Sequence, residues 1–133
     1  MSCDILPPMS KFSELNPHVS EGIRLFNEGR YFDAHEALET AWRTEAGSIR
    51  DLYKGILQVA VCYLHITRHN YDGAIKMHHR SQKWLANWPD VVLGIHVAQL
   101  KADLAATVTE LQRLGPDGIE SFDLTLLKPI SYE

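Results

Sequence analysis

Hydrophobic residues recur at the spacing of an amphipathic helix in five successive segments of the chain. The first segment, NPHVSEGIRLFNEG, offers Asn16 as an N-cap and Pro17 at the first helical position, and Gly29 is its expected end. The second helix is expected from Tyr31 to about Ala46. Its apolar face, which is expected to belong to the core, consists of Tyr31, Ala34, Leu38 and Trp42.

The third helix, in the segment IRDLYKGILQVAVCYLHITRH (residues 49–69), is expected to be the central one, because apolar residues cover well over half of its circumference. Ser48 is its expected N-cap. A fourth helix is expected at about residues 71–87 and a fifth at about residues 97–114, where Gly115-Pro116 ends it.

The fold expected from these segments is an all-α bundle of about five helices, since no segment alternates like a set of strands and short connections favour antiparallel neighbours. Two similar stretches, GRYFDA at residues 29–34 and HNYDGA at residues 69–74, each follow one helix and begin the next. They indicate two antiparallel helical hairpins with tetratricopeptide-like packing, in which Ala34 and Ala74 let the helices approach closely.

The whole chain of 133 residues is expected to form one domain. Residues 1–16, with two consecutive prolines and no periodicity, are expected to be an N-terminal arm. Residues 17–114 form the expected helical core, and residues 115–133 a C-terminal tail that lies extended across the bundle.

The composition is that of an ordinary globular domain, with 45% hydrophobic and 23% charged residues and a net charge of -4. The negative charge argues against a nucleic-acid partner, which needs a basic stripe on the protein. Cys3 and Cys62 are too few for a disulfide framework, which favours a reducing compartment. No signal-peptide pattern and no apolar stretch of the ~20 residues that span a membrane is found. We therefore expect a cytoplasmic protein with no membrane partner.

His35 and Glu39 form the first candidate site, because residues four apart lie side by side on one face of a helix. Glu36 points about 100° away from His35. One histidine and one carboxylate are half of a metal site, which needs a further ligand such as His65. The alternatives are an acid/base or binding pair and a core histidine that bonds to Glu39 or to a tyrosine hydroxyl.

A second candidate is the polar stripe of Lys54, Gln58 and His65 on the apolar third helix. This stripe either faces solvent or joins the helix of His35 to line one polar pocket. Arg43 is placed to form an exposed ion pair with the carboxylate four residues before it, or to bind an anionic group if the site is concave.

The run LFNEGRYFDAHEALETAWR, followed by YKGILQVAVCYLHITRHNYDGAIKM, resembles the small bacterial and archaeal family called domain of unknown function 309. The resemblance covers about residues 25–80, and GIHVAQL is similar to a later segment of the family pattern. It implies a compact all-helical domain and no established reaction. The positions typical of the family are Tyr31, His35, Glu36, Glu39, Trp42, Gln58, His65, Asn70 and Gly73.

Two residues depart from the family pattern. His69 stands where the pattern has glycine, and it is expected to alter the turn that a glycine would ease. His96 stands where the pattern has an aspartate, which would serve as a helix cap.

Three functions are compatible with the sequence. The first is a polar pocket that binds a small polar ligand or supports acid/base chemistry; the second is a helical interaction module or homodimer with a purely structural His/Glu network; the third is a metal-dependent hydrolase. The sequence identifies no cofactor. The residues expected to be catalytic are His35, Glu39 and His65, and those expected to contact the ligand are Tyr31, Glu36, Trp42, Arg43, Lys54 and Gln58.

Overall fold

Five helices follow one another in the computed structural model, which describes residues 15–133. The expected N-terminal arm therefore lies outside the described residues, except for its last two positions. The helices are α1 (Pro17–Asn27), α2 (Tyr31–Thr44), α3 (Arg50–Thr67), α4 (Tyr71–Leu85) and α5 (Val97–Gly118). The remaining elements are two short antiparallel strands, β1 (Val91–Val92) and β2 (Ile95–His96), and two 3-10 turns, η3 (Ile119–Ser121) and η4 (Leu124–Leu126).

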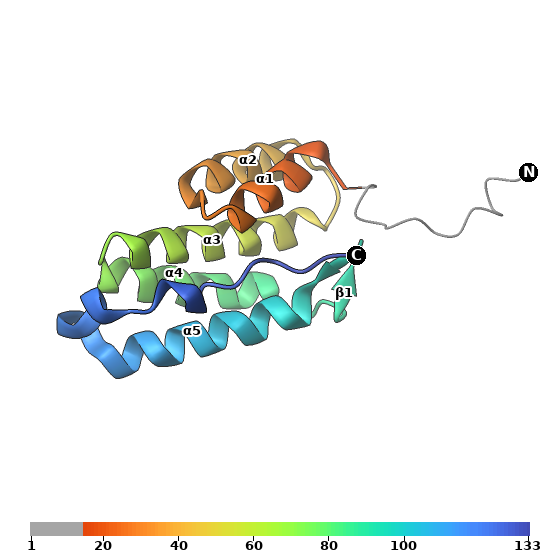
Figure 1. Ribbon diagram of the computed structural model, residues 1–133. Coiled ribbons are helices and arrows are strands. Elements are labelled where there is room, and N and C mark those ends of the chain that lie inside the picture. The colour runs from red at the N-terminus through yellow and green to blue at the C-terminus, as the bar shows by residue number, and fades with distance from the viewer. Residues whose placement is uncertain (1–14) are drawn as a thin grey trace, which may run out of the picture.

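Each helix packs mainly against its neighbours in the chain, so that α2 lies on α1, α3 on α2, α4 on α3 and α5 on α4 (Figure 1). The connections between the first four helices are short, which makes consecutive helices antiparallel. The expected all-α bundle of about five helices is confirmed. Within residues 15–133, the only strands are β1 and β2, which have two residues each and pair with each other.

The central position expected for α3 is confirmed by its burial, because ten of its residues are buried. Tyr63 of α3 packs against Phe26 of α1 and Tyr31 of α2, with ring centroids 5.4 Å and 5.6 Å away. Phe26 and Tyr31 also contact each other edge to face, at 5.2 Å. These three rings join the first three helices into one core.

Two glycines mark the places where paired helices come closest. A β-carbon on Gly22 of α1 would lie 2.7 Å from Leu38 Cγ of α2, and one on Gly55 of α3 would lie 2.7 Å from Leu85 Cδ2 of α4. Ala34 and Ala74, which the sequence pattern assigned to close helix contacts, are fully buried. The two hairpins therefore depend on small residues on both helices of each pair.

Three helix ends lie where the sequence predicts them. The Asn16 side chain accepts a hydrogen bond from the backbone N–H of His18 at 2.9 Å, as an N-cap does. Gly29 after α1 has a φ of 80°, and Gly115 interrupts α5 with a φ of 72°. Both values lie in the left-handed region that glycine adopts without strain. One further helical turn after Gly115 carries α5 to residue 118.

Other helix ends differ from the prediction. The N-cap of α3 is Ile49 instead of Ser48, and its side chain makes no capping bond. The backbone N–H of Asp51 bonds to the carbonyl of Ser48, so a turn replaces the side-chain cap. Helices α2 and α4 each end two residues earlier than expected, because the residues that follow them have extended backbone angles.

The C-terminal tail runs back along the bundle, as expected (Figure 1). The Asn27 side chain at the end of α1 donates to the carbonyl of Ile130 at 3.0 Å and accepts from its N–H at 2.7 Å. Ser131 and Glu133 bond to the β1–β2 hairpin through their backbones. The tail thus connects the first helix with the hairpin that precedes α5.

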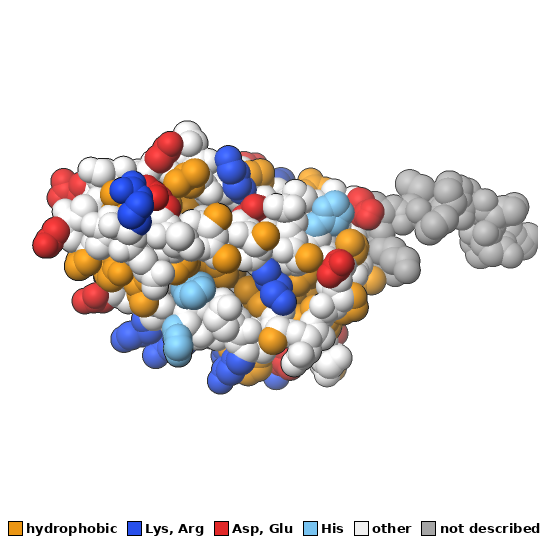
Figure 2. Space-filling model, turned by 90° about the horizontal axis from the view of Figure 1, so that it is seen from below, with side chains coloured by type: hydrophobic (Ala, Val, Ile, Leu, Met, Phe, Trp, Pro, Cys, Tyr) orange, Lys and Arg blue, Asp and Glu red, His pale blue; other side chains and the backbone are white. Residues whose placement is uncertain are grey.

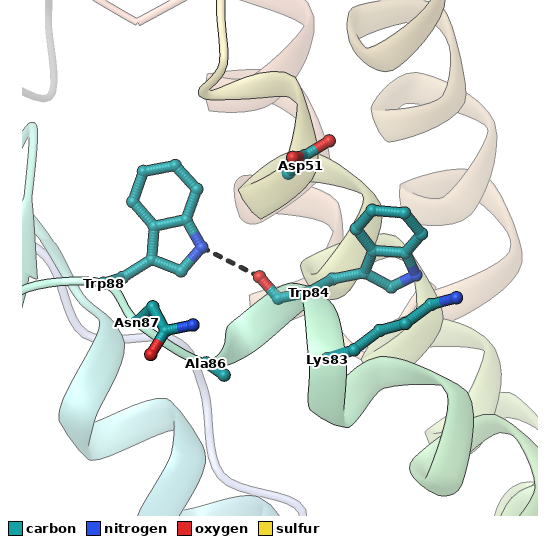
Figure 3. A pocket seen from close by; sticks show the side chains of 6 residues that line it. All are labelled: Asp51, Lys83, Trp84, Ala86, Asn87 and Trp88. Atoms are coloured by element: carbon teal, nitrogen blue, oxygen red, sulfur yellow. Dashed lines mark hydrogen bonds between the residues drawn. The ribbon is translucent and has the colours of Figure 1, made fainter.

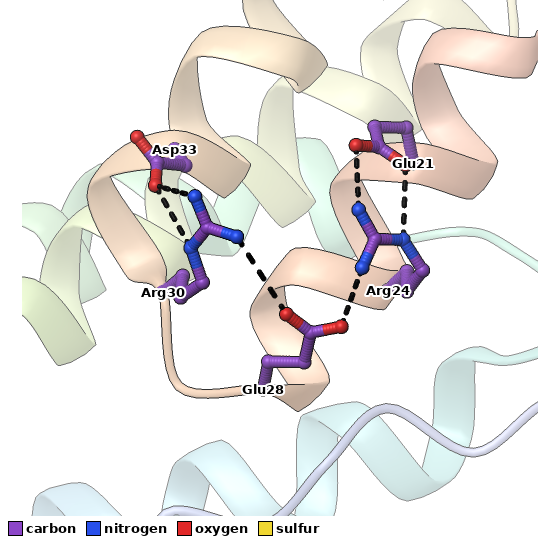
Figure 4. A network of polar contacts seen from close by, with 5 residues as sticks. All are labelled: Glu21, Arg24, Glu28, Arg30 and Asp33. Carbon is purple, nitrogen blue, oxygen red and sulfur yellow. Dashed lines mark hydrogen bonds and ion pairs between the residues drawn. The ribbon is translucent and has the colours of Figure 1, made fainter.

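The turn between α1 and α2 carries a network of exposed ion pairs (Figure 4). Arg24 pairs with Glu21 and Glu28, and Arg30 pairs with Glu28 and Asp33. The hydrogen bond from Arg24 lowers the pKa of the Glu21 carboxyl. Because exposed ion pairs contribute little to stability, this network orients the turn more than it stabilises the fold.

The surface seen from below, on the side of α5, mixes hydrophobic side chains with charged groups of both signs (Figure 2). On α5 itself, Ala102 and Ala106 are exposed. Scattered small apolar residues are normal on a protein surface. Among residues 15–133, no helix is long and apolar enough to cross a membrane.

His69, at the turn between α3 and α4, has a φ of 58°, in the left-handed region of backbone conformation. The family pattern has glycine here, which adopts this conformation without strain, whereas the β-carbon of histidine makes it unfavourable. His69→Gly is expected to raise the free energy of unfolding by up to about 1 kcal/mol, because relief of the strain exceeds the extra chain entropy of glycine. Denaturant unfolding measures this change. The matched control His79→Gly, in the interior of α4, should lower stability by about 1 kcal/mol; an equal loss at His69 would contradict the prediction.

Candidate functional site

The side chain of Lys54 lies between two tryptophans on the outer side of α3. Its Nζ is 4.3 Å from the ring centroid of Trp42 on α2 and 5.5 Å from that of Trp84 on α4. A lysine ammonium at such distances from an indole face is attracted by the ring. Lys54, the first residue of the predicted polar stripe, therefore lies between α2 and α4.

Two more cations extend this arrangement across three helices. Arg50 Cζ is 4.8 Å from the ring centroid of Trp42, and Lys83 Nζ is 4.8 Å from that of Trp84. We call the five residues Arg50, Trp42, Lys54, Trp84 and Lys83 the cation–aromatic row. The expectation that Trp42 belongs to the core is wrong in part: Trp42 packs against the core but is only half-buried, and Arg50 and Lys54 lie over its ring.

The cation–aromatic row is positively charged although the protein is acidic. Residues 50–88 contain six lysines and arginines but only two aspartates, so the negative net charge resides elsewhere in the chain. Among the described residues, no carboxylate lies within 4.0 Å of the charged nitrogens of Arg50, Lys54 or Lys83. These three cations are therefore available to a negatively charged group.

Gln58 follows Lys54 by one helical turn on the same side of α3. Only 8% of its surface is exposed, and its Oε1 atom is buried with no hydrogen-bond partner among residues 15–133. A buried carbonyl oxygen without a partner costs about 1–3 kcal/mol. Gln58 is therefore an unsatisfied acceptor beside the cation–aromatic row.

His35 and Glu39 do not form the pair that their spacing predicts. The Glu39 carboxylate lies 3.3 Å from Arg43 instead, which confirms the expected exposed ion pair. The His35 ring is half-buried with its centroid 5.8 Å from that of Phe32, and among the described residues it has no hydrogen-bond or ion-pair partner. The helical repeat places His35 on the side of α2 that carries Trp42, two turns away.

His65 lies in the last helical turn of α3, next to the connection to α4. Its Nδ1 lies 3.2 Å from Nδ2 of Asn70, while Oδ1 of Asn70 accepts from the N–H of Gly73 at 2.9 Å. Because Nδ2 of Asn70 can only donate, Nδ1 of His65 accepts and the ring proton is on Nε2. Burial lowers the pKa of His65, with a smaller contribution from Arg68. A β-carbon on Gly73 would lie 2.8 Å from the His65 ring, so these three family-typical residues form one packed unit.

The other sequence-predicted residues are distributed over different environments. Tyr31 is 7% exposed and is held in the core by its aromatic neighbours. Glu36 and Arg43 are exposed on α2. Of the nine residues, only Trp42 with Lys54, and Glu39 with Arg43, are in direct contact through a ring or an ion pair.

The sequence analysis missed Arg50, Lys83 and Trp84. The spacing along each helix gave only part of the information: Arg50 lies one turn before Lys54, and Trp84 follows Lys83 directly. Nothing in their local pattern says that α2 and α4 lie on opposite sides of Lys54.

A pocket of about 300 Å³ adjoins the row where α4 ends (Figure 3). Its lining residues are Asp51, Lys83, Trp84, Ala86, Asn87 and Trp88. Two further depressions lie on the outer side of α4, near Tyr71 and Arg80, and between α5 and the tail, near His96 and Lys128. In the part of the chain described, no three His, Cys, Asp or Glu side chains are arranged to hold a metal ion.

Comparison with protein families matches residues 19–77 to a family model described as "Domain of unknown function (DUF309)". The matched segment extends from α1 into α4 and includes all nine family-typical positions, so the resemblance seen in the sequence is confirmed. A search of curated proteins found no match.

Proposed function

We propose that this protein, whose residues 19–77 match the DUF309 family, is a binding domain that holds a small polar, anionic ligand on the outer side of α3. The site would consist of Trp42, Lys54 and Gln58, with Arg50 at one end. The observation that carries the proposal is the Gln58 Oε1 atom, which is buried and accepts no hydrogen bond within residues 15–133. It lies one helical turn from Lys54, a cation that pairs with no carboxylate of these residues. A ligand with a hydrogen-bond donor and a negative charge would bond to the Gln58 oxygen through the donor and pair with the cations through the charge.

An anionic ligand is supported by the charge of the site. Lys54 and Arg50 are held by the Trp42 ring, and Arg50 Nε also donates to the Trp42 carbonyl at 3.3 Å. Side chains that are already oriented lose less conformational entropy when a ligand binds. The two cations would therefore bind a carboxylate or phosphate at little cost in ordering.

Binding is better supported than acid/base catalysis. A general base needs a partner that orients it, and the carboxylate nearest in sequence, Glu39, pairs with Arg43 instead of His35. Nδ1 of His65 is engaged in the α3–α4 turn. A metal-dependent hydrolase has no support from the side-chain arrangement of residues 15–133.

The interaction module or homodimer is the second candidate, and it is favoured by one observation. Phe32, next to His35 in space, is 47% exposed. A single exposed ring is common in monomers, so this surface carries less weight than the buried amide of Gln58.

Thermal melting of the protein against a panel of carboxylates, phosphate esters and neutral analogues tests the proposal. A ligand at one hundred times its Kd adds ~2.7 kcal/mol of stability. The expected result is a shift with an anionic compound that is lost in Lys54→Gln and kept in Lys101→Gln, an exposed lysine of α5. If no anion shifts the wild type, or if Lys54→Gln responds like the wild type, the proposal is wrong.

A further inference from the structure

The pocket at the end of α4 has two indole rings as walls (Figure 3). Trp88 is held in place because its Nε1 donates to the carbonyl of Trp84 at 2.8 Å. Between these residues, Asn87 has a φ of 66°, in the left-handed region, so the chain turns sharply where α4 has ended. The rings of Trp84 and Trp88 consequently lie on opposite sides of the pocket, with Asp51 of α3 beyond them.

Three polar side chains line this pocket without a hydrogen-bond or ion-pair partner among residues 15–133, namely Asp51, Asn87 and Lys83. The Lys83 ammonium lies over the Trp84 ring. The pocket therefore offers an acceptor, an amide and a cation, together with aromatic surface. This combination is that of a site for a planar ring with polar edges and a negative charge.

We propose that this pocket binds a mononucleotide, with the base against the Trp88 indole and the phosphate at Lys83. The Asp51 carboxylate would accept from an amino or ring N–H group of the base, and the Asn87 amide can both donate and accept. The volume of about 300 Å³ is at the lower limit for ligand pockets.

A cationic ligand fits this pocket less well, although aromatic walls and a carboxylate are also used to bind quaternary amines. Lys54 and Lys83 both lie near the Trp84 ring, at 5.5 Å and 4.8 Å from its centroid. Their positive charges would repel a second cation at the same wall. An anion is attracted mainly by Lys83, which is the nearer of the two cations and lines the pocket.

This inference goes beyond the proposed function and does not depend on it. The pocket contains neither Lys54 nor Gln58, so a ligand can bind at either place alone. Lys83→Gln tests the pocket, and Lys54→Gln tests the outer side of α3. If one proposal fails, the other can still be tested with its own variant.

Isothermal titration calorimetry of the full chain with adenosine monophosphate, guanosine monophosphate, adenosine and inorganic phosphate tests the inference. We expect a mononucleotide to bind with a saturable signal, adenosine more weakly, and phosphate alone without a measurable signal. Lys83→Gln should weaken the nucleotide by about tenfold, the loss of one charge-assisted contact. Asp51→Asn should change the ratio of the affinities for the two bases, because it alters a hydrogen-bonding group.

Lys76→Gln is the matched control, since Lys76 is an exposed lysine of the same helix outside this pocket. It should leave mononucleotide binding unchanged. The inference is overturned if neither mononucleotide binds at millimolar concentration or if phosphate binds as tightly as a nucleotide. It is also overturned if Lys76→Gln weakens binding as much as Lys83→Gln, which would indicate a diffuse basic surface for a polyanion.

Discussion

Replacing Tyr63 with alanine is expected to lower the free energy of unfolding by about 3–5 kcal/mol. Tyr63 is fully buried on α3, and its ring contacts Phe26 of α1 and Tyr31 of α2. Removal of the ring leaves a cavity among three helices, where the surrounding side chains relax only in part. Denaturant unfolding, followed by circular dichroism, measures the loss.

Two variants make the Tyr63 prediction specific. Tyr63→Phe should cost much less, because it removes only the hydroxyl and keeps the ring that contacts Phe26 and Tyr31. Phe32→Ala removes a ring of similar size that is 47% exposed, and it should change stability by less than ~0.5 kcal/mol. A loss of less than about 1 kcal/mol in Tyr63→Ala would show that the three rings do not form the core described above.

Gly55→Val is expected to lower the free energy of unfolding by about 3 kcal/mol. The added β-carbon would lie 2.7 Å from Leu85 Cδ2 and 3.2 Å from Trp84 Cβ, so α3 and α4 must separate. In an exposed helix, replacing glycine gains up to ~1 kcal/mol from helix propensity, but overpacking in this contact costs more. In Gly55→Val, the two methyl groups of the valine side chain have no orientation that avoids α4.

The Gly55 variant should also disturb the cation–aromatic row, because Trp84 is displaced with α4. A change in tryptophan fluorescence of the folded variant reports that displacement. The control is Gly47→Val, in the exposed turn before α3, where a β-carbon meets only the end of the Glu45 side chain at 3.2 Å. If both variants were equally stable, the close packing of α3 on α4 would not be a stabilising feature.

Helical periodicity was sufficient to predict the helices and the two hairpins, because a buried face repeats every three or four residues whatever it packs against. It also placed Asn16, Gly29 and Gly115 correctly at helix ends, where local backbone rules decide the structure. The end of α4 was predicted less well. The turn through Asn87 depends on contacts of Trp88, which no local rule describes.

The candidate site was predicted only in part, because spacing along one helix does not determine what the neighbouring helix presents. The sequence predicted Lys54 and Gln58 as part of a polar stripe on an apolar helix, but it did not predict the two tryptophan rings beside Lys54. Trp42 was assigned to the core because its position fits the apolar face. In the structure Trp42 lies at the edge of that face, and its ring contacts the Lys54 ammonium.

The most direct test of the account is the free energy of unfolding of Gln58→Met compared with wild type, without added ligand. Methionine has the shape of glutamine but no amide. If Gln58 is kept for a ligand, the variant should be about 1 kcal/mol more stable, since an unsatisfied acceptor has been removed. Gln112→Met, an exposed position on α5, is the control and should be neutral. A Gln58→Met variant less stable than wild type by 1 kcal/mol or more would contradict the account and favour a structural polar network.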